Sequence, residues 1–137
     1  MSAARTRLRV VGAAILQGGT CLVAQRGADM SMPLKWEFPG GKLEPGEDAR
    51  AALVREIREE LALEIEVGQR LGRGVSEQDG RRIELEVFAA TRVGGEVRLA
   101  EHCRYGWFAA HEIDGLDWAA ADRPVLAALK RRLRAGG

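Results

Sequence analysis

Residues 41–63, GKLEPGEDARAALVREIREELAL, determine how the rest of this sequence is interpreted. A Pro-Gly-Gly turn is expected at 39–41, where the stretch begins, because these residues fit poorly inside a strand or a helix. From about residue 47 to residue 61 the segment predicts one amphipathic helix, since apolar residues recur at helical spacing. The apolar side consists of Ala51, Ala52, Leu53, Val54, Ile57 and Leu61.

The opposite side of this expected helix carries three carboxylates, Glu56, Glu59 and Glu60, which share one face because residues three and four apart are surface neighbours. One interpretation is a solvated face stabilised by ion pairs, in which Arg55 reaches Glu59. The other is a hard cation such as Mg²⁺, which prefers oxygen ligands and often binds a few carboxylates together with substrate phosphates. A backbone carbonyl at Gly40 would complete such a site.

The segment resembles the Nudix signature, in which five residues separate a Gly from a Glu, and seven more precede R-E-U-x-E-E-x-G-U, where U is a bulky aliphatic residue. Ala62 stands where that family has glycine. Residues 36–42, WEFPGGK, resemble the MutT-like branch, whose members hydrolyse nucleoside triphosphates. The similarity extends over nearly the whole chain. The residues that match the signature are Gly41, Glu47, Arg55, Glu56, Ile57, Glu59, Glu60 and Leu63.

This resemblance implies an α/β protein with the Nudix fold, an α/β/α sandwich whose mixed sheet carries the signature as a loop-helix-loop, in a single domain of residues 1–137. It implies Mg²⁺ or Mn²⁺ as cofactor. Within the signature it makes Glu56 the general base, Arg55 the residue that orients the glutamates, and Glu47 a brace or cap of the loop. The implied metal ligands are the Gly40 carbonyl, Glu56, Glu59, Glu60 and Glu101.

Glu101 lies outside the signature, six residues before Trp107. By resemblance it matches an additional glutamate on a late loop of MutT-like enzymes, which helps to bind metal or to activate water. The alternative is an ordinary loop carboxylate. The neighbouring His102 is expected to be incidental.

Four residues are candidates for binding the substrate: Arg26, Lys42, Arg81 and Asp122. Arg26 is either a solvated residue at a strand end or a nucleotide contact, as in MutT-like proteins. Asp122 is either the N-cap of the last helix or a reader of the base. An ionised Asp only accepts hydrogen bonds, which suits the N4 amino group of cytosine. A protonated Asp could donate to the O6 of guanine.

We therefore expect hydrolysis of a (d)NTP to (d)NMP and pyrophosphate, with a preference for CTP, dCTP and 5-methyl-dCTP. The alternative substrate is 8-oxo-dGTP, whose removal sanitises the nucleotide pool. A protein of another class, a Nudix-fold module that binds nucleotides without hydrolysing them, is disfavoured because all the glutamates of the signature are present. ADP-ribose and diadenosine polyphosphates are disfavoured by the similarity to triphosphate hydrolases.

The chain has 137 residues and a net charge of +1, which indicates one domain and gives no reason to expect nucleic acid or a membrane as partner. Cys21 and Cys103 match no metal or redox motif, so reduced thiols in the cytoplasm are expected. A monomer or a homodimer is expected. Strands are expected at 8–16, 20–25, 64–67, 69–75, 81–90, 97–99 and 105–108, a loop at 27–35, and a last helix from residue 121 or 122 with Pro124 in its first turn.

Overall fold

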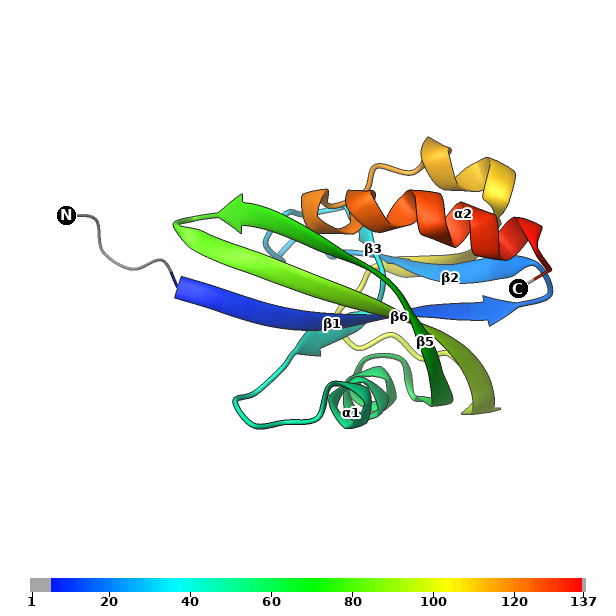
Figure 1. The fold of residues 1–137 in the computed structure, drawn as a ribbon, viewed down its shortest axis with the longest axis horizontal. Helices are drawn as coiled ribbons and strands as arrows, with labels where there is room; N and C mark the ends of the chain where they lie inside the picture. Colours follow the sequence, from blue (N-terminus) through cyan, green and yellow to red (C-terminus); the bar gives the residue numbers. More distant parts are fainter. Residues whose placement is uncertain (1–5, 137) are drawn as a thin grey trace.

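The computed structural model describes residues 6–136, which form a mixed β-sheet with helices on both faces (Figure 1). The strand order is β3-β2-β1-β6-β5, with β4 paired to β1 and β7 paired to β2. None of the helices described is long and apolar enough to cross a membrane. Along the chain the elements are β1 (Thr6–Gln17), β2 (Thr20–Gln25), β3 (Trp36–Glu37), β4 (Gly40–Lys42), α1 (Ala49–Leu61), β5 (Leu63–Gln78), β6 (Arg81–Gly95), β7 (Arg104–Ala109), the 3₁₀ helices η1 (Ala110–Gly115) and η2 (Ala120–Val125), and α2 (Leu126–Arg134).

Strand β1 lies in the middle of the sheet, as its apolar sequence predicts. It runs parallel to β6 and antiparallel to β2, and its segment from Val11 to Ile15 is buried. A strand in this position has both faces covered, which explains why its sequence lacks the usual alternation of apolar and polar residues.

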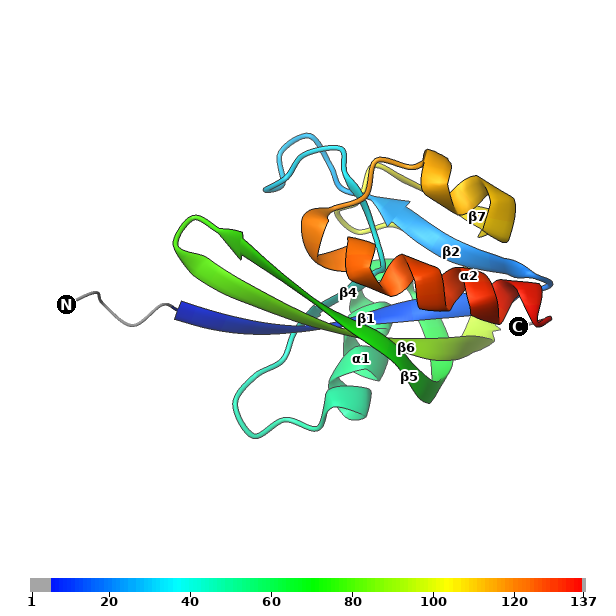
Figure 2. The same cartoon turned by 45° about the horizontal axis from the view of Figure 1, so that its top comes forward.

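Two separate apolar cores hold the helices against the sheet, with α1 on one face and α2 on the other (Figures 1 and 2). The first core contains Leu129 and Leu133 of α2 together with Trp118. The second is built on α1, whose buried residues are Ala52, Leu53, Ile57 and Leu61. The expected α/β/α sandwich is confirmed, although Ala51 is exposed and does not belong to the apolar side of α1.

Both ends of α1 are set by local backbone chemistry. The helix begins at Ala49, two residues later than expected from the sequence, because Asp48 is its N-cap and accepts a hydrogen bond from the N–H of Ala51 at 2.9 Å. At the other end Ala62 adopts the left-handed conformation, with φ 59° and ψ 28°, and donates its N–H to the carbonyl of Arg58. The signature's usual glycine position is thus occupied by an alanine in the conformation that favours glycine.

We expect Ala62→Gly to raise the free energy of unfolding by up to about 1 kcal/mol, because glycine adopts this conformation without steric strain. Ala51→Gly is a matched control in the first turn of the same helix, where glycine should destabilise by up to about 1 kcal/mol. Urea unfolding of the two variants measures both effects. A lower stability of Ala62→Gly would contradict the left-handed helix end.

The segment at 97–99 is not a strand, contrary to expectation. This part of the chain instead crosses the carboxyl end of α1. The N–H of Arg98 donates to the carbonyl of Leu61 at 2.9 Å, and the N–H of Ala100 donates to the carbonyl of Glu60 at 3.1 Å. These bonds use carbonyls that a helix end leaves free. They also bring the loop that carries Glu101 next to the signature helix.

Strands β5 and β6 form one long hairpin that extends beyond the helices (Figure 1). The expected break at Gly68 is wrong, because β5 continues through it with irregular pairing between Val67 and Arg70. A bulge lets a strand accommodate such residues without ending. The hairpin turns at Asp79 and Gly80, and this tip contributes to the pocket described below.

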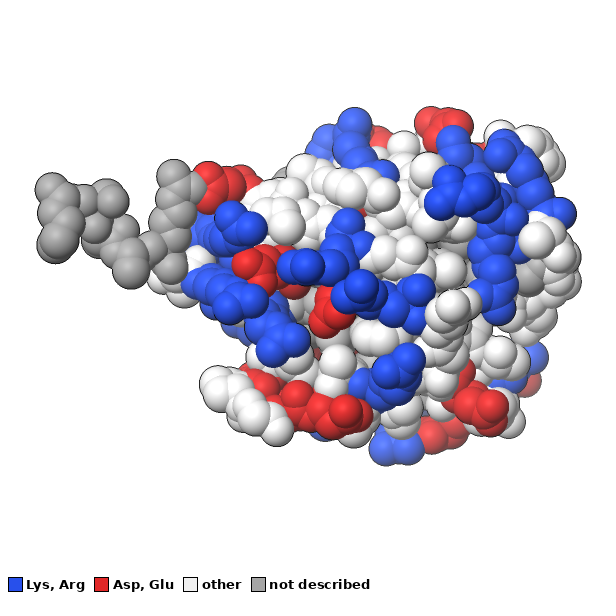
Figure 3. Space-filling model, viewed as in Figure 1, with Lys and Arg blue, Asp and Glu red and all other residues white. Residues whose placement is uncertain are grey.

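Charged side chains on the outer face of the sheet are paired, as a solvated face predicts. Glu84 accepts from both Arg7 and Arg82, at 2.6 and 2.8 Å, and Glu86 accepts from Arg70 at 2.9 Å. Figure 3 shows acidic and basic side chains intermingled over the strands, whereas basic side chains predominate near the carboxyl end of α2. Basic residues there interact favourably with the dipole of α2.

Candidate active site

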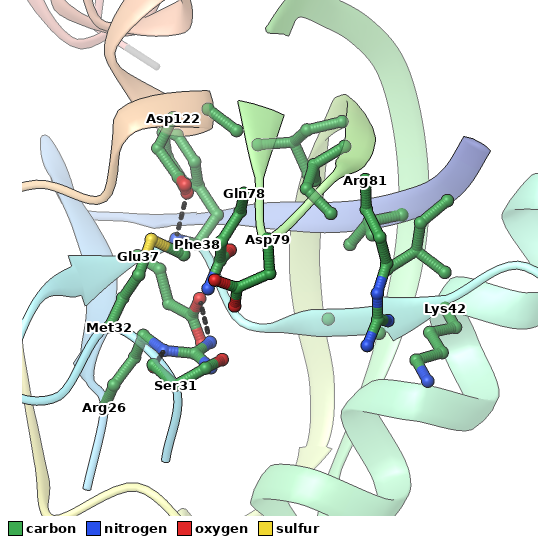
Figure 4. Close-up of a pocket in the computed structure, with 17 residues that line it drawn as sticks. Arg26, Ser31, Met32, Glu37, Phe38, Lys42, Gln78, Asp79, Arg81 and Asp122 are labelled. Atoms are coloured by element: carbon green, nitrogen blue, oxygen red, sulfur yellow. Dashed lines mark hydrogen bonds and ion pairs between the residues drawn. The ribbon is translucent and has the colours of Figure 1, made fainter. Parts of the chain in front are cut away.

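A pocket of about 420 Å³ lies between β4, the tip of the β5–β6 hairpin, the loop at 27–35 and η2 (Figure 4). All four substrate-binding candidates line it, which are Arg26, Lys42, Arg81 and Asp122. Lys42 and Arg81 lie near one another at one end, while Arg26 and Asp122 lie toward the other (Figure 4). The sequence did not single out several other lining residues, which include Ser31, Met32, Glu37, Gln78 and Asp79.

Arg26 is not the freely solvated residue that one interpretation of the sequence proposed, since its side chain is only 15% exposed. Its guanidinium donates to the carboxylate of Glu37 at 2.8 Å and to both the carbonyl and the hydroxyl of Ser31. Arg26 therefore holds the loop at 27–35 against β3 while its side chain also lines the pocket.

Asp122 is buried, with 5% exposure, and is not the N-cap of a helix. The last helix is preceded by η2, whose N-cap is Ala119 and whose six residues include both Asp122 and Pro124. The Oδ2 atom of Asp122 instead accepts a hydrogen bond from the N–H of Phe38 at 2.9 Å. Burial raises the pKa of Asp122 to about 8; this hydrogen bond lowers it in part, and the nearby charge of Glu37 raises it further.

The two glycines of the expected turn at 39–41 lie in the short strand β4, which pairs with β1. A Cβ atom at Gly40 would overlap the carbonyl of Val11, and one at Gly41 would overlap the carboxylate of Glu56. Because glycine has no side chain, β4 can approach β1 on one side and the signature helix on the other. The Pro-Gly-Gly segment was wrongly expected to exclude a strand, because close pairing is possible when Cβ is absent.

Arg55 connects three glutamates of the signature. Its guanidinium donates to Glu47 and to Glu56, each at 2.9 Å, and lies 3.6 Å from a carboxylate oxygen of Glu59. Glu47 also accepts the N–H of Glu44 at 3.0 Å, so it braces the loop before α1. The side chain of Glu56 is only 14% exposed, and this burial raises its pKa although Arg55 opposes the shift.

Glu60 faces the loop that carries Glu101. Burial raises the pKa of Glu60, and the charge of Glu101 adds to that effect while His102 opposes it. His102 is buried between Glu60 and Glu37, so the expectation that it is incidental does not describe its position. Glu101 itself is exposed.

The carboxylates on the polar face of α1 are ligands of the type that a hard divalent cation prefers. Glu56, Glu59 and Glu60 offer oxygen ligands, and the partial burial of two of them raises the free energy of their charged forms, which a bound cation would offset. Within residues 6–136, however, no group of three or more His, Cys, Asp or Glu side chains is arranged so that it could hold an ion as it stands. Mg²⁺ commonly takes only a few carboxylates and completes its coordination with water and substrate phosphates.

Comparison with known proteins agrees with this geometry. The NUDIX domain matches residues 6–129, which is most of the chain. The chain belongs to the Nudix hydrolase family. A putative 8-oxo-dGTP diphosphatase 2 of Mycobacterium tuberculosis is 42% identical to this Nudix hydrolase over 127 residues, covering 90% of this chain and 89% of the relative. The CTP pyrophosphohydrolase of Escherichia coli is 40% identical over 121 residues, covering 88% and 90%.

Solved structures of other proteins also superpose on this Nudix hydrolase. The solution structure of the E. coli ORF135 protein superposes with a TM-score of 0.80 at 38% identity and covers 96% of this chain and 93% of that one. The crystal structure of a MutT protein from Methanosarcina mazei gives a TM-score of 0.85 at 27% identity, covering 96% and 98%. The expected family and fold are therefore confirmed.

Proposed function

We propose that this Nudix hydrolase converts a nucleoside triphosphate to the monophosphate and pyrophosphate, with Mg²⁺ or Mn²⁺ as cofactor. One observation carries the proposal: the pocket that contains the candidate nucleotide contacts is lined by Gly40 and Gly41, and Glu56 packs directly against Gly41. A nucleotide bound in this pocket would therefore have its phosphates beside the carboxylates of the signature.

In this proposal the metal is held by the Gly40 carbonyl, Glu56, Glu59, Glu60 and Glu101. When bound, the ion neutralises phosphate charge and lowers the pKa of its water. Glu56 accepts the proton of the attacking water as general base, which its partial burial favours by raising its proton affinity. Arg55 orients Glu56 and Glu59 through the contacts described above, and Glu101 contributes from the opposite loop.

The pocket assigns different parts of the nucleotide to different residues. Lys42 and Arg81 form its cationic end and are placed to bind phosphate oxygens (Figure 4). Arg26 supports the loop at 27–35 and lines the wall on the far side. Asp122, buried beside Phe38, offers the remaining hydrogen-bonding capacity of its carboxyl group to the base.

A preference for cytidine nucleotides follows if Asp122 is ionised in the complex. A carboxylate accepts hydrogen bonds only, so it pairs with the N4 amino group of cytosine and repels the O6 of guanine. The similarity to the E. coli CTP pyrophosphohydrolase supports this choice.

The raised pKa of Asp122 favours a second candidate substrate, 8-oxo-dGTP. With a pKa of about 8 the carboxyl group is mostly protonated at neutral pH, and it can then donate a hydrogen bond to O6. The neutral acid can also serve cytosine, donating to N3 and accepting from N4. The similarity to the putative 8-oxo-dGTP diphosphatase 2 of M. tuberculosis supports this second candidate.

Release of pyrophosphate from a panel of nucleotides tests the proposal. The panel contains CTP, dCTP, 5-methyl-dCTP, 8-oxo-dGTP and the four ordinary dNTPs, each measured with Mg²⁺ and with Mn²⁺. We expect metal-dependent turnover, with dCTP among the best substrates. Binding of these nucleotides without release of pyrophosphate would instead identify a binding module, and a best substrate outside both classes would refute the role of Asp122.

We also expect the ratio of kcat/KM for dCTP to that for 8-oxo-dGTP to rise as pH increases through about 8. Deprotonation removes the donor that guanine needs but leaves the acceptor that cytosine needs. Because the ratio compares two substrates at the same pH, changes in metal-bound water or in Glu56 affect both and largely cancel. A ratio that stays constant between pH 6.5 and pH 9.5 would contradict this role of the carboxyl group.

A further inference from the structure

His102 and Glu37 form a buried pair between the pocket and the signature helix. The Nε2 atom of His102 lies 2.8 Å from Oε2 of Glu37, and the His102 side chain is only 3% exposed. A carboxylate cannot donate a hydrogen bond, so Nε2 carries the hydrogen when Glu37 is ionised. The other oxygen of Glu37 accepts from Arg26 at 2.8 Å, which fixes the orientation of this carboxylate.

The second ring nitrogen points toward a proposed metal ligand. Nδ1 of His102 lies 3.9 Å from Oε2 of Glu60, beyond hydrogen-bond distance, and it has no hydrogen-bond partner although it is buried. Unpartnered buried polar atoms are rare and call for an explanation. A small rotation of Glu60 toward the ring would bring the two atoms within hydrogen-bond distance.

The loop that carries His102 is anchored on both sides. The N–H of Ala100 donates to the carbonyl of Glu60 at 3.1 Å, and the N–H of Cys103 donates to that of Gln25 at 3.0 Å. Gly27 packs so closely against the backbone carbonyl of Glu101 that a Cβ atom there would lie 2.9 Å from it. The side chain of His102 is buried in this loop, while Glu101 next to it remains exposed.

We propose that His102, held by Glu37, is a positioning residue that sets Glu60 and the Glu101 loop in the geometry needed to bind the divalent cation. This inference rests on the metal-dependent function proposed above. Nδ1 of His102 faces Oε2 of Glu60 at 3.9 Å, so the ring lies beside a carboxylate that is proposed to bind the ion. Groups that orient the ligands of a metal typically change its affinity 10- to 100-fold when they are removed.

The same pair connects the metal site to the nucleotide pocket. Ser31, Arg26, Glu37 and His102 form a continuous chain of hydrogen bonds from the loop at 27–35. Glu60 lies beyond its end. A nucleotide that displaces Arg26 from Glu37 would therefore disturb the support of Glu60.

The test measures two quantities for wild type and for each variant. The first is the affinity of the folded, nucleotide-free protein for Mn²⁺, measured by electron paramagnetic resonance. The second is the Mg²⁺ concentration that gives half-maximal turnover. His102→Phe keeps a ring of similar size but removes both nitrogens. His102→Gln keeps a donor that can reach Glu37, and Glu37→Gln keeps an acceptor without the charge. His111→Phe is the matched control, because the chain has two histidines and His111 is exposed on η1.

We expect His102→Phe to weaken Mn²⁺ binding about 10- to 100-fold and to raise the half-maximal Mg²⁺ concentration by a similar factor, while KM for dCTP at saturating metal changes far less. His102→Gln and Glu37→Gln should each show a smaller loss of metal affinity, and His111→Phe none. A purely structural role would lower the melting temperature and leave the affinity of the folded protein for Mn²⁺ unchanged, and that result would overturn the inference.

If His102→Phe does not fold, the two glutamine variants decide the question, and wild-type Mn²⁺ affinity in both of them overturns the inference. Measurements on the wild-type protein distinguish failure of the proposed function from failure of this inference. A wild-type protein that neither binds Mn²⁺ nor releases pyrophosphate refutes both proposals, whereas normal wild-type binding with unaltered variants refutes only the role of His102.

Discussion

Glu56→Gln is expected to lower kcat by a factor of about 10² to 10⁴, the usual contribution of a general base, and to weaken metal binding as well. The amide can no longer accept a proton from water, and it is a poorer ligand for Mg²⁺ than a carboxylate. It can still accept the hydrogen bond that Arg55 donates at 2.9 Å, so the packing against Gly41 is expected to persist.

The stability of this variant separates catalysis from folding. Burial raises the pKa of Glu56, and the charges of Glu59 and Glu47 add to the shift. A neutral glutamine avoids both unfavourable effects, so the melting temperature without metal should stay the same or increase. Glu66→Gln is the matched control, because Glu66 is exposed on β5, away from the signature helix. Steady-state kinetics and thermal unfolding measure both variants. Turnover of Glu56→Gln close to that of wild type would exclude Glu56 as the general base.

Asp122→Asn is expected to shift base preference strongly toward 8-oxo-dGTP. An asparagine amide donates and accepts at every pH, so it serves both O6 and the N7–H of the oxidised base, and it loses the charge that favours cytosine. Sites built around a buried hydrogen bond can discriminate by about 10⁴. Above about pH 8, where the carboxyl group of Asp122 is ionised, the ratio of kcat/KM for dCTP to that for 8-oxo-dGTP should therefore fall by about two orders of magnitude or more, and its dependence on pH should disappear. An unchanged ratio would exclude Asp122 as a reader of the base.

The pH dependence of stability provides an independent measurement on the same variant. The folded-state pKa of Asp122 is about 8, above its ordinary value of 3.8, so folding favours the protonated form. Its contribution to stability is complete below about pH 4 and is lost as the pH rises through about 8. Asparagine has no proton to lose. Urea unfolding should therefore show Asp122→Asn more stable than wild type by a few kcal/mol at pH 8, with similar stability near pH 4.

Local sequence patterns predicted the elements whose structure depends on near neighbours. The spacing of Glu56, Glu59 and Glu60 identified the carboxylate face of α1, because helical periodicity acts over a few residues. The apolar run of β1 identified the central strand for a similar reason. The expected end of the helix at residue 61 is observed as well, since backbone preferences are local. Family resemblance added the roles that these residues are expected to perform.

Strand boundaries were predicted less well, because pairing partners decide them. Gly68 breaks an isolated pattern, but β6 provides a partner along which β5 continues through a bulge. Residues 97–99 have the composition of a strand, but the backbone N–H groups of Arg98 and Ala100 donate to carbonyls at the end of α1 instead of to a neighbouring strand. A short sequence window contains no information about either partner.

The amino-acid sequence by itself determined the family, the signature helix and the candidate residues for the chemistry. Only the tertiary structure decided how the candidate binding residues are placed. Asp122 meets Phe38 across 84 residues of chain, and His102 meets Glu37 across 65. Such contacts depend on how the two cores pack against the sheet, and burial then sets the pKa of Asp122. Burial and long-range contact arise only when the whole chain has folded, so no local pattern encodes them.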